Sequence, residues 1–247
     1  MDDITLYNGD CLEIMRELPT GGVDMILCDL PYGTTACKWD TVLPLDELWS
    51  HYWRVIKENG AVVLFAAQPF TTALIHSGRR WFRYCWYWKK NNKTGGPFAR
   101  VQPMRCIEDI AVFYKHAPTY NAQGLIKLEK PIIREPRLTP IYQMRGKGNT
   151  QEFTNWPHHL LEFKNDTMNK NRLHPTQKPV ALLEYLVRTY TNESEIVLDN
   201  CMGSGSTGVA CIRTGRRFIG IEKDEHFYRV AKDRLAKEQP ERAEITK

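Results

Sequence analysis

Short apolar runs alternate with stretches that have helical spacing in both halves of the chain. Residues 23–28 and 61–65 are apolar runs of strand length, and the first of them ends just before Pro31. Residues 45–56 between them have the apolar spacing of a helix. Residues 83–88 and 107–114 are two further strand candidates. Strands without a polar face predict a sheet buried on both sides.

The C-terminal half repeats this alternation after an interruption. From 119 to 172 the regular pattern fades, which is typical of a functional insert. The pattern then predicts, in order, a helix over 180–190, a strand over 195–198, a helix ending at 213, a strand over 218–222 and a last helix from about 225. We therefore expect an α/β fold, with a mostly parallel sheet between helices, and a division into 1–118, 119–172 and 173–247.

Composition narrows the class of protein. The 247 residues, 42% of them hydrophobic, suffice for one α/β domain with a modest insertion. No apolar run approaches the roughly 20 residues of a membrane helix, and the acidic N-terminus lacks signal-peptide features, so we expect a cytoplasmic protein with no membrane partner. The seven cysteines form no CxxC pair, which favours reduced, buried thiols and no metal site.

Charge is unevenly distributed. Between residues 79 and 105 there are eight Lys or Arg, seven aromatic residues and no acidic residue. Cations for phosphates and flat rings for bases are what a nucleic-acid groove requires. The alternative is a half-buried strand with its aromatic residues in the core and its charges in water.

A glycine-rich turn follows the predicted strand 195–198 and opens a helix. It runs from Asp199 through Gly203 and Gly205, which allow close approach of a ligand to the backbone. Glu222 ends the next strand, where a carboxylate can accept both hydroxyls of a ribose. The turn is neither GxGxxG nor GxxxxGKS, which favours a nucleoside without a pyrophosphate. The alternative is a tight turn with no ligand.

The first-half turn, Asp29-Leu30-Pro31-Tyr32, also follows a strand. Since ligands bind beyond the carboxyl ends of strands in such sheets, both turns are expected to face one crevice. The Asp29 carboxylate and the Leu30 carbonyl provide two acceptors for a planar NH₂ group, and Tyr32 a ring to stack on. Taken alone, a helix-capping Asp beside a core Tyr explains this turn as well.

Together the two turns resemble the (D/N/S)PP(Y/F/W) and DPFxGSGT motifs of the amino-group DNA methyltransferases. The catalytic motif precedes the cofactor motif, as in the circularly permuted β class. Residues 8–11, 108–115 and the HPTQKP sequence at 174–179 resemble further motifs of that class, so the similarity spans about 4–118 and 174–235. The chain departs from the motifs at Leu30 and at Asn200-Cys201, which replace Pro and Pro-Phe.

The resemblance implies a Rossmann-like methyltransferase fold and S-adenosylmethionine as cofactor. It implies transfer to adenine N6 of a base flipped out of double-stranded DNA, with 119–172 as the target-recognition insert. It also implies a bacterial or phage protein, and a homodimer is expected because the permuted type often pairs. The catalytic residues would be Asp29, Leu30, Pro31 and Tyr32, and the cofactor-binding residues Asp10, Cys11, Lys178, Asp199, Gly203, Gly205, Ser206 and Glu222.

The same residues are compatible with other functions. Asp29 is the commoner choice for adenine but is compatible with cytosine N4. An RNA adenine methyltransferase would use the same site, and Leu30 and Cys201 keep a catalytically degenerate nucleic-acid-binding protein in consideration. Lys178, expected at the cofactor carboxylate, has the alternative of a solvated surface lysine.

Overall fold

The computed structural model describes residues 3–33, 41–134, 148–165 and 177–245. Contacts between Cα atoms divide the chain into two compact units. Unit 1 comprises Met1–Asn121 and His159–Lys247, and unit 2 comprises Ala122–His158. Among the described residues, no helix is both long enough and apolar enough to span a bilayer.

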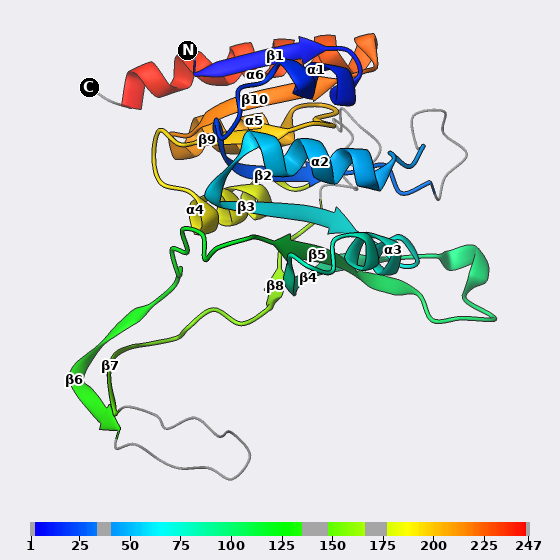
Figure 1. Cartoon of the computed structure of the whole chain (residues 1–247). Coiled ribbons are helices and arrows are strands. Elements are labelled where there is room, and N and C mark those ends of the chain that lie inside the picture. The colour runs from blue at the N-terminus through cyan, green and yellow to red at the C-terminus, as the bar shows by residue number, and fades with distance from the viewer. Residues whose placement is uncertain (1–2, 34–40, 135–147, 166–176, 246–247) are drawn as a thin grey trace. The chain divides into compact units, whose positions relative to one another are not determined.

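An eight-stranded sheet runs through unit 1 (Figure 1). Its strands lie in the spatial order β1 (Ile4–Asn8), β10 (Arg217–Glu222), β9 (Ile196–Asp199), β2 (Val23–Asp29), β3 (Ile56–Ala66), β5 (Arg105–Phe113), β4 (Phe82–Thr94) and β8 (Leu160–Glu162). The first five are mutually parallel, β5 is antiparallel to both β3 and β4, and β8 is parallel to β4. The prediction of a mostly parallel sheet is confirmed.

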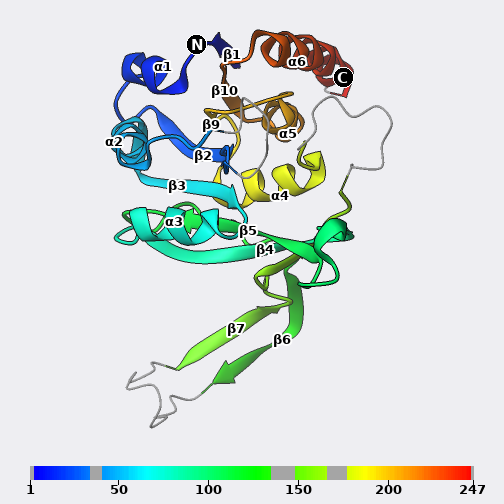
Figure 2. The ribbon, with the colours of Figure 1, turned by 90° about the vertical axis from the view of Figure 1, so that its right-hand side faces the viewer.

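Helices cover both faces of this sheet (Figure 2). One layer holds α1 (Cys11–Glu17), α2 (Leu45–Val55) and α3 (Phe70–Ser77), and the other α4 (Val180–Tyr190), α5 (Ser206–Thr214) and α6 (Glu225–Ile245). Along β2, Met25 and Leu27 pack in the layer of α4–α6, whereas Ile26 and Cys28 pack in the layer of α1–α3. Because successive side chains point to opposite faces, burial on both sides requires the uninterrupted apolar run seen in the sequence.

The two halves of the chain meet where β2 pairs with β9. The pairing is parallel, with Met25 opposite Val197 and Ile26 opposite Leu198. Parallel neighbours end at the same edge of a sheet, so Asp29 and Asp199 emerge at one edge although they are far apart in sequence. The same edge receives the end of β10 at Glu222.

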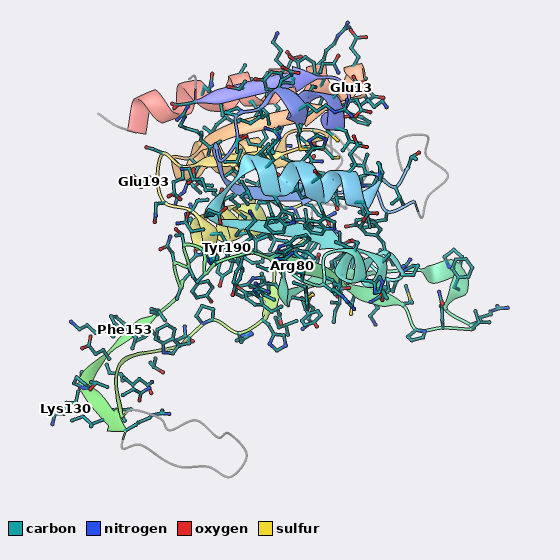
Figure 3. All side chains as sticks on the ribbon, viewed as in Figure 1. Glu13, Arg80, Lys130, Phe153, Tyr190 and Glu193 are labelled. Atoms are coloured by element: carbon teal, nitrogen blue, oxygen red, sulfur yellow. The ribbon has the colours of Figure 1, made fainter. Side chains whose placement is uncertain are left out.

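Unit 2 is built on two antiparallel strands, β6 (Ile126–Arg134) and β7 (Asn149–Thr154). In Figure 3 the side chains of these strands, including Lys130 and Phe153, project from the two-stranded ribbon. The described part of 119–172 thus contains three strands that the sequence pattern did not predict: β6, β7 and β8, which joins the main sheet. Nearly every residue of β6 is exposed, so it lacks the apolar alternation by which a strand is recognised.

Gly208 provides a test of the packing between α5 and α6. A Cβ atom there would lie 2.8 Å from Leu235 Cδ2 and 2.8 Å from the Phe218 ring. We expect Gly208→Ala to lower the free energy of unfolding by about 1–3 kcal/mol through overpacking. Gly96→Ala is the matched control because no heavy atom lies within 4 Å of its added Cβ. Urea denaturation of both variants measures the difference, and equal stabilities would contradict the packing described.

Candidate active site

The carboxyl ends of β1, β2, β9 and β10 open into one cavity of about 850 Å³ within unit 1. Most of the residues singled out by the sequence line it: Asp10, Cys11, Asp29, Leu30, Pro31, Tyr32, Lys178, Asp199, Gly203, Ser206 and Glu222. The two turns therefore share a single crevice. His174, Pro175 and Thr176 lie outside the described residues.

Asp199 anchors the glycine-rich turn. Its Oδ2 accepts a hydrogen bond of 2.6 Å from the Thr207 hydroxyl, and its Oδ1 accepts one of 3.1 Å from the Cys201 amide. Burial raises the pKa of Asp199 to about 6, although these two donors oppose the shift. The carboxylate thus fixes the turn from within.

Glu222 connects this turn to the loop after β10. Its Oε2 accepts from the Gly203 amide at 2.9 Å, and its Oε1 accepts from the Asp224 amide at 2.8 Å. Burial raises its pKa while the backbone donors counteract that rise. Each oxygen has further acceptor capacity, and the residue lines the cavity, so the carboxylate can receive two hydroxyl groups there.

Of the neighbouring residues Gly205 and Ser206, only Ser206 lines the cavity. Gly205 does not line the cavity: its φ of +74° turns the chain into α5, and an added Cβ would lie 3.1 Å from Ala231 Cβ on α6. It serves the turn and the helix packing. Ser206 does line the cavity, and its hydroxyl accepts a 2.9 Å hydrogen bond from Arg234.

Asp10 and Cys11 enter the cavity at the start of α1. Asp10 caps the helix through a 2.9 Å bond from the Leu12 amide to its Oδ1, and Lys223 Nζ lies 3.0 Å from its Oδ2. Burial opposes ionisation of Asp10, but Lys223 and the amide outweigh it and lower the pKa. Cys11 is buried beside the amide of Asn200.

Asn200 and Cys201, where the chain departs from the Pro-Phe of the motif, have their own partners. The Tyr52 hydroxyl donates a 2.6 Å hydrogen bond to Asn200 Oδ1, and Asn200 Nδ2 lies 3.6 Å from Cys11 Sγ and 3.5 Å from Cys201 Sγ. The buried amide is therefore satisfied on both sides. Tyr52, on α2, was not identified from the sequence.

Asp29 is held by two neighbours. The Tyr32 hydroxyl donates to its Oδ1 at 2.6 Å, and Lys178 Nζ donates to its Oδ2. Lys178 is only 8% exposed, which excludes a solvated lysine. The half-buried carboxylates of Asp29 and Glu108 compensate its charge, and the contact with the cofactor carboxylate that the resemblance implies stays a prediction.

Glu108, on β5, extends this pair into a chain of alternating charges. Its Oε2 lies 3.5 Å from Lys178 Nζ, and Lys90 Nζ binds its Oε1. Burial opposes ionisation of Glu108, but the two lysines lower its pKa. For Lys178, burial acts against the charge, whereas Asp29 and Glu108 raise the pKa above its usual value. Glu108 Oε2 accepts no hydrogen bond from the described residues.

Aromatic rings enclose the space around Asp29. Tyr32 stacks on Phe70 with ring centroids 5.2 Å apart and an interplanar angle of 23°. Phe65 and Trp88 also line the cavity, and Lys178 Nζ lies 5.0 Å from the Phe65 centroid. A flat ligand can therefore meet both a π-face and the acceptors of Asp29. Phe70 carries no sequence signal for this role. Glu108 lies in a segment that resembles a motif of the family, but no role was assigned to it from the sequence.

Comparisons with known proteins agree with this geometry. A family model described as DNA methylase matches residues 23–233. The chain is 28% identical to the type II methyltransferase M.HpaI of Haemophilus parainfluenzae, over 96% of this chain and 75% of that protein. It is 27% identical to the DNA adenine methyltransferase YhdJ of Escherichia coli, over 94% and 82% of the two chains.

Two solved structures also align with the chain. The M1.HpyAVI–SAM complex does so with a TM-score of 0.65 and 26% identity, covering 94% of this chain and 98% of that one. The cytosine-N4-specific PvuII DNA methyltransferase aligns with a TM-score of 0.66 over 96% and 93% of the chains, and its 15% identity shows a shared fold alone.

The raised pKa of Asp199 predicts a pH-dependent stability. A carboxyl group whose pKa is higher in the folded protein stabilises the fold at low pH, and this contribution is lost as pH rises through about 6. Asp199→Asn removes the titration. The difference in free energy of unfolding, variant minus wild type, should therefore be roughly 2 kcal/mol more favourable to the variant at pH 7.5 than at pH 4.5. Urea denaturation at both values measures this, and a pH-independent difference would contradict the shift.

Proposed function

Because the chain belongs to the DNA methylase family and is an S-adenosylmethionine-dependent DNA methyltransferase, we propose that it methylates N6 of an adenine flipped out of duplex DNA. One observation carries this proposal. Asp29 and Tyr32 line the same cavity as Glu222 and the glycine-rich turn, so a methyl donor and a base amino group can meet there.

The residues around the glycine-rich turn fit the cofactor. Glu222 is fixed by two backbone amides and retains lone pairs for the ribose hydroxyls. The positive φ of Gly203, +51°, brings backbone close to the ligand without a side chain in the way. Asp10 and Cys11 provide the cavity wall at the end of β1, where the adenine of the cofactor would lie.

Bound S-adenosylmethionine supplies a methyl group on a positively charged sulfur. Asp29 and the Leu30 carbonyl accept hydrogen bonds from the two amino hydrogens of the base, which makes the nitrogen more pyramidal and its lone pair more available. Burial raises the pKa of Asp29, so its carboxylate is also suited to receive the proton that the nitrogen releases. Leu in place of Pro at position 30 retains the carbonyl this role requires.

Tyr32 supplies the stacking surface for the base. Phe70 packs against one face of the Tyr32 ring, and the Tyr32 hydroxyl is hydrogen-bonded to Asp29. The ring is therefore held in place before the base binds. Stacking on an aromatic side chain is worth roughly 1–3 kcal/mol per base, comparable with the few kcal/mol of unstacking.

Lys178 favours the ionised form of Asp29 in this half-buried position. Desolvation favours the neutral carboxyl, and a neutral Asp29 could accept only weakly from the amino group. Glu108 and Lys90 in turn hold the ammonium group of Lys178 at Asp29. Lys178 is thus a positioning residue, acting on the base through Asp29.

Adenine is favoured over cytosine by Asp at position 29 and by the name of the relative YhdJ. Unit 2 carries basic side chains on β6, including Lys127, Lys130 and Arg134, which suits contact with phosphates of the target site. The assay described next distinguishes this proposal from three alternatives: methylation of cytosine N4, methylation of adenine in RNA, and no transferase activity.

The catalytic assignment is tested by Asp29→Ala. We expect wild-type protein to transfer tritium from labelled cofactor to unmethylated duplex DNA, with N6-methyladenine as the product identified by sequencing. Asp29→Ala is expected to lose at least roughly a hundredfold in rate while binding the cofactor normally. Asp233→Ala, an exposed position on α6, is the control. Label in cytosine or in RNA would redirect the proposal, and an active Asp29→Ala would remove its catalytic centre.

The pH–rate profile tests the role of Lys178. Without the cation, the folded-state pKa of Asp29 rises further, so Lys178→Met should shift the acid limb of the profile upward by about one unit or more. Activity would recover partly at high pH. Lys178→Arg, which keeps the positive charge, should move the acid limb less. If the lysine instead binds the cofactor carboxylate, calorimetry on Lys178→Met would show weaker cofactor binding with an unmoved acid limb.

A further inference from the structure

The ten residues between β4 and β5 form an ordered loop. Thr94 pairs with Arg105 at its base, and the loop contains the 3-10 helix η1 (Gly96–Phe98). The Phe98 amide donates to the Gly95 carbonyl at 3.0 Å, and the Phe98 carbonyl accepts from Val101 and Gln102 at 3.0 Å each. In Figure 1 the loop extends away from the sheet beyond the ends of β4 and β5. These bonds set the directions of its side chains in advance.

This loop exposes large apolar side chains. Val101 is 83% exposed, Phe98 58% and Met104 39%. All three lie on the same ten-residue loop and none belongs to a buried core cluster. Exposed apolar side chains that gather on one segment mark an interaction site.

Positive charge surrounds these apolar residues. The stretch 89–105 contains five Lys or Arg and no acidic residue. Lys89 and Lys90 are paired with Glu162 and Glu108. Lys93, Arg100 and Arg105 form no ion pair with a described carboxylate, so their charges are available to a partner. Duplex DNA fits such a loop, because its phosphates would contact the cations and its stacked bases would contact the apolar side chains.

The loop is also continuous with the proposed base pocket. Lys90 and Thr94, just before it, line the cavity, as does Glu108, just after it. The loop therefore starts and ends at the side of the cavity where Asp29 and Lys178 lie. The residues that flank the loop on both sides thus belong to the pocket that would receive the base.

We propose that the loop acts as a wedge: Phe98, assisted by Val101, enters the duplex and fills the space that the extruded base leaves, while Lys93, Arg100 and Arg105 bind flanking phosphates. The proposal rests on the proposed function, because only a flipped base leaves such a gap. An inserted side chain restores contact with the neighbouring base pairs and opposes return of the base.

Single-turnover methylation of two duplexes tests the wedge. Both carry the target site, and in the second an abasic site replaces the base opposite the target, so that the target is already unpaired. We expect Phe98→Ala to be slowed roughly tenfold or more on the paired duplex and to stay within about threefold of wild type on the second. Phe98→Trp should retain activity on both. Tyr7→Ala, an exposed aromatic residue on β1, is the matched control and should leave both rates unchanged.

The outcomes are distinguishable. Equal slowing of Phe98→Ala on both duplexes would show a role in binding or folding and overturn the wedge, as would no slowing on either. Wild-type protein that methylates neither duplex would instead overturn the proposed function itself. Fluorescence of 2-aminopurine at the target position supplies a second readout. It should rise when wild-type protein binds and rise markedly less with Phe98→Ala.

Discussion

The site depends on the parallel pairing of β2 with β9. This contact joins two segments about 170 residues apart and fixes the ends of both strands at the same edge of the sheet. Asp29 and Asp199 thereby open onto one cavity, with Glu222 supplied by the next strand. A slip of one residue would move every side chain of β2 to the opposite face. Burial of Met25 and Leu27 on one side, and of Ile26 and Cys28 on the other, prevents such a slip.

Electrostatics then shape what the cavity can do. Asp29, Lys178, Glu108 and Lys90 alternate in sign, so each charge in this partly buried row has an opposite neighbour. Burial works against the charged forms of Asp29, Glu108 and Lys178, and the opposite charges beside each of them counteract that effect. Such preorganised charge needs little rearrangement when a substrate binds. The glycine-rich turn uses backbone amides for the same purpose around Glu222.

The sequence predicted the parallel sheet and the meeting of its two turns because apolar runs and turn residues are local signals. It did not predict the partner of Lys178, since Glu108 comes from a strand that is antiparallel to its neighbours and 70 residues away in the chain. Phe70 and Tyr52 are ordinary helix residues in sequence and become site residues only through packing. The strands of unit 2 were missed because an exposed ribbon needs no apolar period. Gly205, by contrast, was expected at the cofactor and lies against α6.

A crystal structure with S-adenosylhomocysteine and a duplex containing the target site tests most directly whether one cavity serves both reactants. We expect the ribose on Glu222 and the extruded base on Tyr32, with its amino group at Asp29 and the Leu30 carbonyl. The sulfur should be directed at that amino nitrogen. A sulfur directed away from Asp29, or a base that stays stacked in the duplex in such a complex, would contradict it.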